Sequence, residues 1–284
     1  MSALNSVAAA HEREVSAGQR FQFGRNWARF LKRLNLERIT EAENNLKEFL
    51  GEGSLASNTF LDIGSGSGLS SLAARRLGAV VLSFDFDSQS VACTEELHHR
   101  YFPGDESWTV DQGSVLDKEY LAGLGQFDIV YSWGVLHHTG AMWQAMENVQ
   151  PLVKPGGRLF IAIYNDCGEV SRWWLRRKRR YNALPRLLRV PYAIYAWAPQ
   201  EIRSLLSHWR SGEVKTYLRD LASPRCPRGM SWVHDVIDWV GGYPYEYASV
   251  AEIVAFYARA GFKPLKIREN SSYGCHQIVF ERSR

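Results

Sequence analysis

The sequence predicts an α/β fold built on a doubly wound, mostly parallel sheet. From Thr59 to Tyr164, short apolar runs typical of strands alternate with segments typical of helices. A loop with three glycines follows the first run and leads into an Ala/Leu/Arg-rich helical segment, which is the opening of a βαβ unit. Such alternation places helices on both faces of the sheet, so a ligand is expected at the carboxyl ends of the strands.

Local patterns predict the individual elements. The core strands are expected at 59–63, 80–84, 108–110, 127–132 and 158–164, with helices between them at 70–77, 88–99, 118–124 and 141–149. Apolar residues at helical spacing predict one or two further helices over 27–50. Near the C-terminus, Ser249 and Glu252 have the spacing of a capping box and Gly261 supplies a helix stop. Closing strands are predicted at 265–268 and 277–281.

The chain divides into four segments. Residues 1–58 form an N-terminal helical segment, 59–164 the core, 165–247 an insertion, and 248–284 the completion of the core. Between Arg172 and Arg228, fourteen Arg and Lys residues stand against three acids, although the whole chain has a formal charge of only +4. The insertion is therefore predicted to be a basic, aromatic cap on a mildly acidic core.

Composition argues against a secreted, membrane-spanning or metal-binding protein. The N-terminal residues show no secretory signal pattern, and no apolar run is long enough to span a bilayer, so a cytoplasmic location is expected. The cysteines at 93, 167, 226 and 275 are scattered without a C-x-x-C pair. Neither a disulfide framework nor a metal site is predicted.

The loop "GSGSG" at 64–68 bears on the ligand class. Its glycines let the backbone approach a ligand closely, as in sites for NAD, FAD and S-adenosylmethionine (SAM). The dinucleotide pattern G-x-G-x-x-G would need a glycine where Leu69 stands. Asp62, two residues before the loop, would repel a pyrophosphate and favour the ammonium and sulfonium of SAM. The loop therefore favours SAM over NAD.

Four stretches together resemble the class I SAM-dependent methyltransferases, most closely the methylases of quinone biosynthesis and their small-molecule relatives. The stretches are "LDIGSGSG", "VLSFDFD", "FDIVYSWGVLHHT" and "LVKPGGRLFIAIYN". The resemblance implies a Rossmann-like, SAM-binding sheet of seven strands, the last antiparallel, carrying an inserted helical cap. It also implies methyl transfer from SAM to a small-molecule or lipid-linked acceptor, at a hydroxyl, thiol or amine, with release of S-adenosylhomocysteine (SAH).

The resemblance assigns the cofactor contacts to the ends of the first four strands. Asp85 would accept hydrogen bonds from the ribose hydroxyls, and Asp62 would hold the methionine ammonium directly or through water. The adenine amine is left to Ser114 or Asp117, because Ser114 stands where many relatives carry an acid. The expected cofactor-binding residues are Asp62, Gly64, Ser65, Gly66, Gly68, Asp85, Phe86, Ser114, Val115, Ser132 and Trp133.

Methyl transfer needs alignment of the reactants, and it needs a base where the acceptor carries a proton. The candidate bases are His137 and His138, which follow the fourth strand, and His234 with Asp235 or Asp238 as its orienting group. The stretch "WVHDVIDWVGGYPYEYAS" gathers rings and carboxylates suited to an acceptor pocket, or to packing and turn capping. The expected substrate-binding residues are Asp238, Trp239, Tyr243, Tyr245 and Glu246.

Two further segments carry expectations about access to the site. Phe23, Asn26 and Trp27 in "FQFGRNWARF" are expected to fold over bound SAM. Residues 172–228 would form a lid, a peripheral membrane contact or, least favoured, a nucleic-acid surface. The alternatives to small-molecule methylation are methylation of RNA or protein, and a SAM-binding regulator without turnover. The oligomeric state is left open.

Overall fold

The computed structural model describes residues 3–216, 219 and 232–284. Within these residues, a sheet of seven strands has the order β3-β2-β1-β4-β5-β7-β6. Neighbouring strands among β1 to β5 pair in parallel, and β7 runs antiparallel between β5 and β6. The strands are β1 (Thr59–Ile63), β2 (Val80–Asp85), β3 (Trp108–Gln112), β4 (Phe127–Trp133), β5 (Val153–Tyr164), β6 (Phe262–Arg268) and β7 (Cys275–Arg282). The predicted Rossmann-like class is confirmed.

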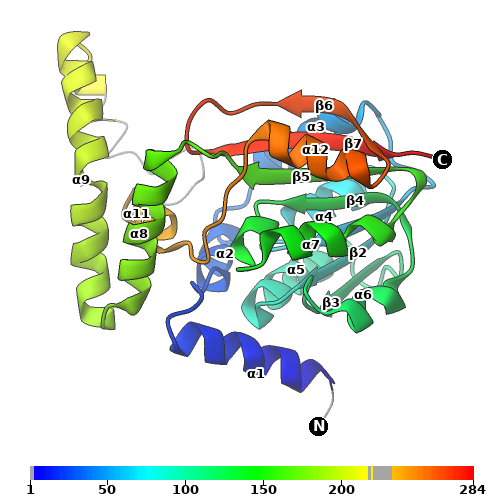
Figure 1. Ribbon diagram of the computed structural model, residues 1–284. Coiled ribbons are helices and arrows are strands. Elements are labelled where there is room, and N and C mark those ends of the chain that lie inside the picture. Colours follow the sequence, from blue (N-terminus) through cyan, green and yellow to red (C-terminus); the bar gives the residue numbers. More distant parts are fainter. Residues whose placement is uncertain (1–2, 217–218, 220–231) are drawn as a thin grey trace.

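Helices cover both faces of the sheet (Figure 1). Alternate residues of β1 explain why two apolar cores form, since Leu61 and Ile63 enter one cluster and Phe60 the other. The first cluster includes residues of α6 (Lys118–Leu124), α7 (Met142–Asn148) and α12 (Val250–Arg259). The second includes residues of α3 (Leu36–Leu50), α4 (Leu69–Arg76) and α5 (Ser88–Tyr101). The ligand-facing edge is therefore left to loops, to the N-terminal segment and to the insertion.

The largest differences from the predicted elements lie at the N-terminus and at the start of β5. A helix α1 (Ala3–Ser16) precedes α2 (Gly24–Leu31), whereas within the predicted N-terminal helical segment the apolar spacing placed helices only over 27–50. Strand β5 begins at Val153 rather than at 158, because Val153 pairs with Phe127 before the register shifts. The Pro-Gly-Gly sequence inside this strand is typical of a turn, so the sequence did not predict that the strand continues through it with a β-bulge against β4.

The insertion forms a helical layer with its own apolar cluster. It contains α8 (Glu169–Ala183), α9 (Arg186–Arg210) and α11 (Trp232–Gly241). Leu184 separates α8 from α9 in extended conformation, as expected before Pro185. In Figure 1, α8 and α9 lie side by side beyond the end of the sheet, with α9 outermost. No described helix combines the length and the apolar character needed to cross a membrane.

Candidate cofactor and acceptor site

The glycine loop lies at the carboxyl end of β1, where the strand order reverses between β1 and β4. This switch point is the usual ligand position in doubly wound sheets. Gly64, Gly66 and Gly68 have φ angles of 75°, 57° and 79°, which side chains rarely adopt. A Cβ at Gly66 would lie 3.0 Å from the indole nitrogen of Trp27. The loop therefore keeps a bare backbone against which α2 packs.

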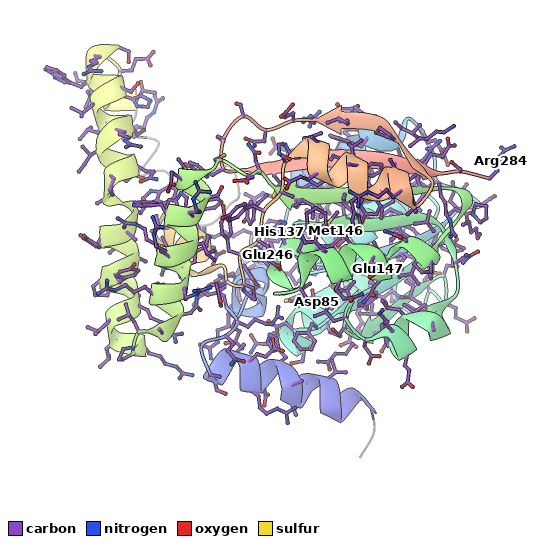
Figure 2. The ribbon with its side chains drawn as sticks, in the orientation of Figure 1. Asp85, His137, Met146, Glu147, Glu246 and Arg284 are labelled. Carbon is purple, nitrogen blue, oxygen red and sulfur yellow. The ribbon has the colours of Figure 1, made fainter. Side chains whose placement is uncertain are left out.

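Asp85 ends β2 beside this loop (Figure 2). Its Oδ2 accepts a hydrogen bond from the Gly66 amide at 2.9 Å, and its Oδ1 accepts one from the Asp87 amide at 2.9 Å. Burial raises the pKa of Asp85 to about 6, against the effect of these two amide bonds. The carboxylate is thus oriented by the backbone and keeps lone pairs for a further pair of donors.

Asp62, in β1, is buried behind the loop and faces the first turn of α4. Its Oδ2 accepts a hydrogen bond from the Ser71 hydroxyl at 2.5 Å. Burial raises the pKa of Asp62 to about 7, and the neighbouring Asp85 carboxylate adds to the rise. A cation beside this pair of carboxylates would stabilise their ionised forms.

The remaining predicted cofactor residues lie around the same strand ends. Ser65 exchanges a hydrogen bond of 2.8 Å with Thr94, and Ser132 donates one of 3.1 Å to the Ile63 carbonyl. The Ser114 hydroxyl accepts from the Leu116 amide at 3.2 Å, which closes a local turn, while Val115 is buried in the core. Trp133 is 43% exposed. The four strand ends are therefore brought together, and the structure leaves the adenine contact between Ser114 and Asp117 open.

The N-terminal segment is tied to Asp87, a residue that the sequence analysis did not single out. Asp87 Oδ2 accepts a hydrogen bond from the Gly24 amide at 2.9 Å and lies 3.7 Å from His11 Nε2. The same side chain caps α5 by accepting from the Gln89 amide. The sequence signal for the helix cap was an aspartate directly before the predicted helix at 88–99. No sequence signal pointed to the contact of Asp87 with α1 and α2.

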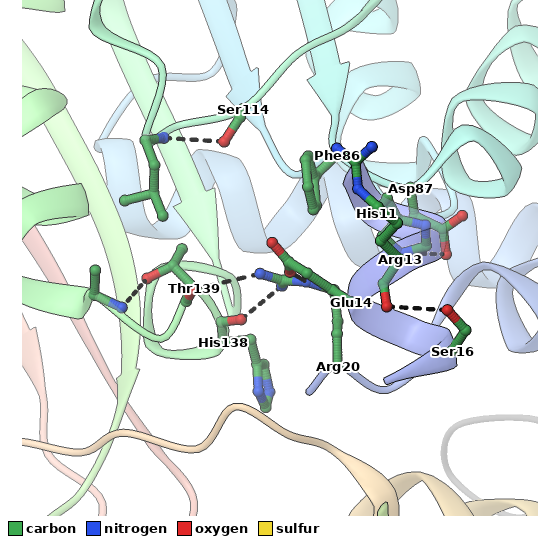
Figure 3. Close-up of polar contacts among 12 residues, drawn as sticks. His11, Arg13, Glu14, Ser16, Arg20, Phe86, Asp87, Ser114, His138 and Thr139 are labelled. Atoms are coloured by element: carbon green, nitrogen blue, oxygen red, sulfur yellow. Dashed lines mark hydrogen bonds and ion pairs between the residues drawn. The ribbon is translucent and has the colours of Figure 1, made fainter. Parts of the chain in front are cut away.

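Arg20 joins this segment to the loop after β4 (Figure 3). Its guanidinium donates to the carbonyls of His138 at 2.8 Å and Thr139 at 3.4 Å, and it lies 5.0 Å from the Phe86 ring centre. The Glu14 carboxylate accepts a hydrogen bond from Arg20 Nε at 2.6 Å through its Oε2. Arg20 therefore spans from the end of β2 to the end of β4, across the expected cofactor position.

His137 and His138 lie under this closure, and both are neutral. Burial lowers the pKa of His138 to about 3 and holds the pKa of His137 well below its usual range. His138 Nδ1 donates to the Pro244 carbonyl at 2.5 Å, so its Nε2 carries the lone pair. His137 Nδ1 accepts from the Tyr164 amide at 3.3 Å, so its Nε2 carries the proton.

The segment 238–247 packs against these histidines and against α2. The Glu246 amide donates to the His137 carbonyl, and its carboxylate accepts from the Met142 amide at the start of α7 (Figure 2). Asn26 donates to the Asp238 carboxylate, and the Phe21 amide donates to the Tyr243 carbonyl. Asp238 thereby joins the acceptor side to the N-terminal segment.

Aromatic residues surround the segment that is expected to bind the acceptor. Trp239 and Tyr245 lie with their ring centres 5.6 Å and 5.0 Å from that of Tyr164. The side chains of His234 and Asp235 lie outside the described part of the chain, so their predicted roles stay predictions. Lys178 of α8 also lies in this aromatic cluster. The sequence analysis did not single out Lys178, because it stands in a run of arginines. Its helical spacing from Trp174 was the available signal.

The comparisons of this sequence with known proteins all find methyltransferases. Residues 61–159 match a family model described as a methyltransferase domain. The ubiquinone biosynthesis O-methyltransferase of Parvibaculum lavamentivorans is 32% identical over 112 residues, covering 37% of this chain and 40% of that protein. The protein of the same name from Brucella ovis is 30% identical over 139 residues, covering 45% of this chain and 54% of that protein. The matches thus span about half, or less, of these relatives.

Solved structures with little sequence identity share the fold. The magnesium protoporphyrin IX methyltransferase of Synechocystis, crystallised with SAH, has a TM-score of 0.53 at 14% identity and covers 86% of this chain and 83% of that one. An O-methyltransferase family protein from Burkholderia thailandensis has a TM-score of 0.51 at 15% identity, with 86% and 57% covered. These likenesses extend the fold assignment beyond the matched core.

Proposed function

Because residues 61–159 match a methyltransferase domain and the sheet has the fold of solved methyltransferases, we propose that this protein transfers a methyl group from SAM to a small aromatic or lipid-linked acceptor. The observation that carries the proposal is the Asp85 carboxylate, held by two amides beside a bare glycine loop at the switch point of the sheet. A carboxylate so placed suits a ribose diol, because each oxygen can accept a further charge-assisted hydrogen bond.

The residues present suit the rest of the cofactor. Asp62 and Asp85 supply negative charge near the loop, which complements the ammonium and sulfonium of SAM. Phe86, which follows Asp85, offers a ring beneath the Arg20 guanidinium that would contact the adenosine part of SAM. Trp27 packs on Gly66, so α2 would close over the bound molecule. Such closure excludes water, which is the main requirement for displacement at a sulfonium.

The acceptor side supplies orientation rather than a nucleophile. SAM provides a methyl carbon made electrophilic by its sulfonium. The acceptor heteroatom forms a bond to that carbon, the carbon–sulfur bond breaks, and its electron pair stays on sulfur in SAH. A hydroxyl acceptor must also lose its proton, and the unprotonated His138 Nε2 is the group that would receive it or hold it in a hydrogen bond.

An oxygen acceptor on an aromatic ring is the preferred class. The curated relatives are named as O-methyltransferases of ubiquinone biosynthesis. The acceptor side of this chain is lined by rings from Tyr164, Trp239 and Tyr245, which suit a planar molecule. These two observations support a phenolic acceptor over a thiol, amine or macromolecule.

The outer face of α9 supports contact with an anionic membrane. Leu187 is 90% exposed, Trp209 69% and Tyr195 68%, whereas Ala193 and Ala196 on the opposite side are buried. The exposed apolar residues form one stripe at helical spacing: Leu187, Leu188, Val190, Ile194, Tyr195, Ile202, Leu205, Leu206 and Trp209. An apolar stripe directed away from the protein core suits a lipid surface.

A neighbouring groove adds the charge that an anionic lipid headgroup requires. It has a volume of about 380 Å³ and is lined by Trp173, Arg176, Arg177, Arg180, Tyr192 and Tyr195. The Arg177 guanidinium lies 3.7 Å from the centre of the Trp173 ring. Lipid phosphates would bind these arginines while the α9 stripe enters the acyl region. A surface of this kind would bring a lipid-linked phenol to the site.

The deciding experiment supplies the purified protein with methyl-labelled SAM and a host-cell extract, and then separates organic-soluble, aqueous and macromolecular fractions. Organic-soluble label, absent with heat-inactivated protein, is the expected result for a lipid-linked phenolic acceptor. Label in a small water-soluble product would keep methyl transfer and remove the lipid link. Label in RNA or protein, or SAM binding without SAH release, would contradict the proposed function.

A further inference from the structure

Lys178 is a buried cation enclosed by aromatic rings. Its side chain lies on the core-facing side of α8 and has no solvent exposure. The ammonium nitrogen lies 4.5 Å from the ring centre of Trp239, 4.8 Å from Tyr245 and 6.0 Å from Trp174. It donates a hydrogen bond to the Trp239 carbonyl, and the carboxylate whose charge acts on it is that of Asp238. A buried charge with so little compensation is costly to keep.

The groups around Lys178 include further donors that lack acceptors. The indole N–H groups of Trp174 and Trp239 are buried without a hydrogen-bond partner, and so is Nε2 of His137. Tyr164 links these groups, since its ring centre lies 4.0 Å from that of His137 and 5.6 Å from that of Trp239. Buried donors in native proteins are almost always satisfied, so this cluster lacks an acceptor that a ligand can supply.

We infer that Lys178 and the surrounding rings bind an anionic oxygen, carboxylate or phenolate, on an aromatic acceptor. This inference deepens the proposed function and rests on it. The rings of Trp174, Trp239 and Tyr245 stack on the planar part of the acceptor, while the ammonium and the N–H donors bind its oxygen. Two of the rings belong to α11 and the loop after it, so separation of α8 from α11 admits the molecule.

The charges that face Lys178 support an anionic ligand. Burial lowers the pKa of Lys178 to about 7, and Asp238 of α11 opposes this effect. His137, His138 and Tyr164 face this site from the sheet side, and burial keeps both histidines neutral. Tyr245 faces it from the loop after α11, and burial raises the pKa of its hydroxyl, which therefore carries no charge. An anion bound beside the ammonium would stabilise its charged form. Binding of an acid that stays ionised should therefore weaken as the pH rises above about 7.

The test measures binding in the full chain by quenching of tryptophan fluorescence, with protocatechuate and its methyl ester as probes. Protocatechuate should bind the wild type at about pH 6 and bind about tenfold or more weakly to Lys178→Met. The exposed control Lys263→Met should bind like the wild type. A weaker methyl ester identifies the carboxylate as the bound oxygen, and an equal ester identifies the phenolic oxygen; both support the site.

Two further measurements keep the test decisive. Lys178→Met removes a buried charge, so it should unfold at the same or a higher temperature than the wild type, whereas a purely structural lysine would give a lower one. If that variant does not fold, the wild type alone suffices, because its protocatechuate affinity should fall between about pH 6 and about pH 8.5. Equal affinity in Lys178→Met, a flat pH profile, or no binding of either probe would overturn the inference.

A separate SAM titration on the same preparations distinguishes this inference from the proposed function. Loss of probe binding with intact SAM binding contradicts only the role of Lys178. Absence of SAM binding contradicts the proposed function, and the probe titration can still be read, since it contains no SAM.

Discussion

At the scale of single residues, the site depends on a few side chains held by backbone groups. Asp85 has two amide partners and Asp62 one hydroxyl partner, so both carboxylates are oriented before a ligand arrives. The histidines after β4 are oriented in the same way, by the Pro244 carbonyl and the Tyr164 amide. Preorganisation of this kind reduces the ordering that binding would otherwise require.

Replacement of Asp85 by Ala should weaken SAM binding by about 10- to 100-fold, because it removes one or two charge-assisted hydrogen bonds worth about 1.5 to 3 kcal/mol. Isothermal titration calorimetry measures the change. The exposed Glu106→Ala, which lies before β3 and so at the opposite end of the strands from Asp85, is the control for loss of an acidic side chain and should bind SAM normally. Unchanged affinity in Asp85→Ala would remove Asp85 from the ribose.

At the scale of elements, α9 exposes its large apolar side chains, whereas an ordinary surface helix buries them. Small buried residues face α8 and α11, and the large apolar ones face away from them. The helix has two internal prolines and basic residues at both ends, so its surroundings, and not propensity alone, must support it. A lipid surface covering its outer stripe would supply that support.

The double variant Leu187→Glu/Trp209→Glu should lose about tenfold or more of the affinity for vesicles that contain an anionic lipid. Both substitutions place a negative charge on the stripe and remove apolar burial. The double variant Leu36→Glu/Leu265→Glu is the matched control, because Leu36 and Leu265 are also exposed but lie outside the insertion. Vesicle flotation measures the difference. Equal binding by the two double variants would contradict the membrane surface.

At the scale of the whole molecule, distant parts of the chain close on one edge of the sheet. Arg20 contacts the loop after β4, Gly24 contacts Asp87, and Asn26 contacts Asp238 of the insertion. The same arrangement buries ionisable groups in a connected region. Burial raises the pKa of Asp62 to about 7, so folding takes up a proton there that the unfolded chain, with a pKa near 4, does not hold.

This proton uptake predicts a specific pH dependence of stability. Between about pH 4 and about pH 7 the folded state binds more protons at Asp62 than the unfolded state, so the contribution of Asp62 to stability falls as pH rises. Asp62→Asn removes that term and should gain up to about 4 kcal/mol relative to the wild type over this interval. Thermal unfolding of both proteins across the range measures the gain. A difference that does not change with pH would contradict burial of an ionisable Asp62.

The order of elements in the core could be predicted from the sequence because their signals are local. Alternating apolar runs, the glycine loop, and the capping box at Ser249 each act within a few residues, and the capping box is present in the structure. The start of β5 and the helix α1 could not be predicted. The first depends on pairing with β4 across a bulge. The second depends on the contact of His11 with Asp87, far away in the sequence, and on that of Glu14 with Arg20.

What the sequence determined by itself was the Rossmann-like core and the ligand class that its glycine loop and acids favour. Only the tertiary structure decided which side chains meet at the strand ends. It placed Arg20 across the expected cofactor position, Asp87 under the N-terminal segment, and Lys178 among the aromatic rings. The physical reason is that burial and charge pairing depend on residues brought together by the fold. Lysines and arginines in one basic run cannot be told apart by sequence until their neighbours in the fold are known.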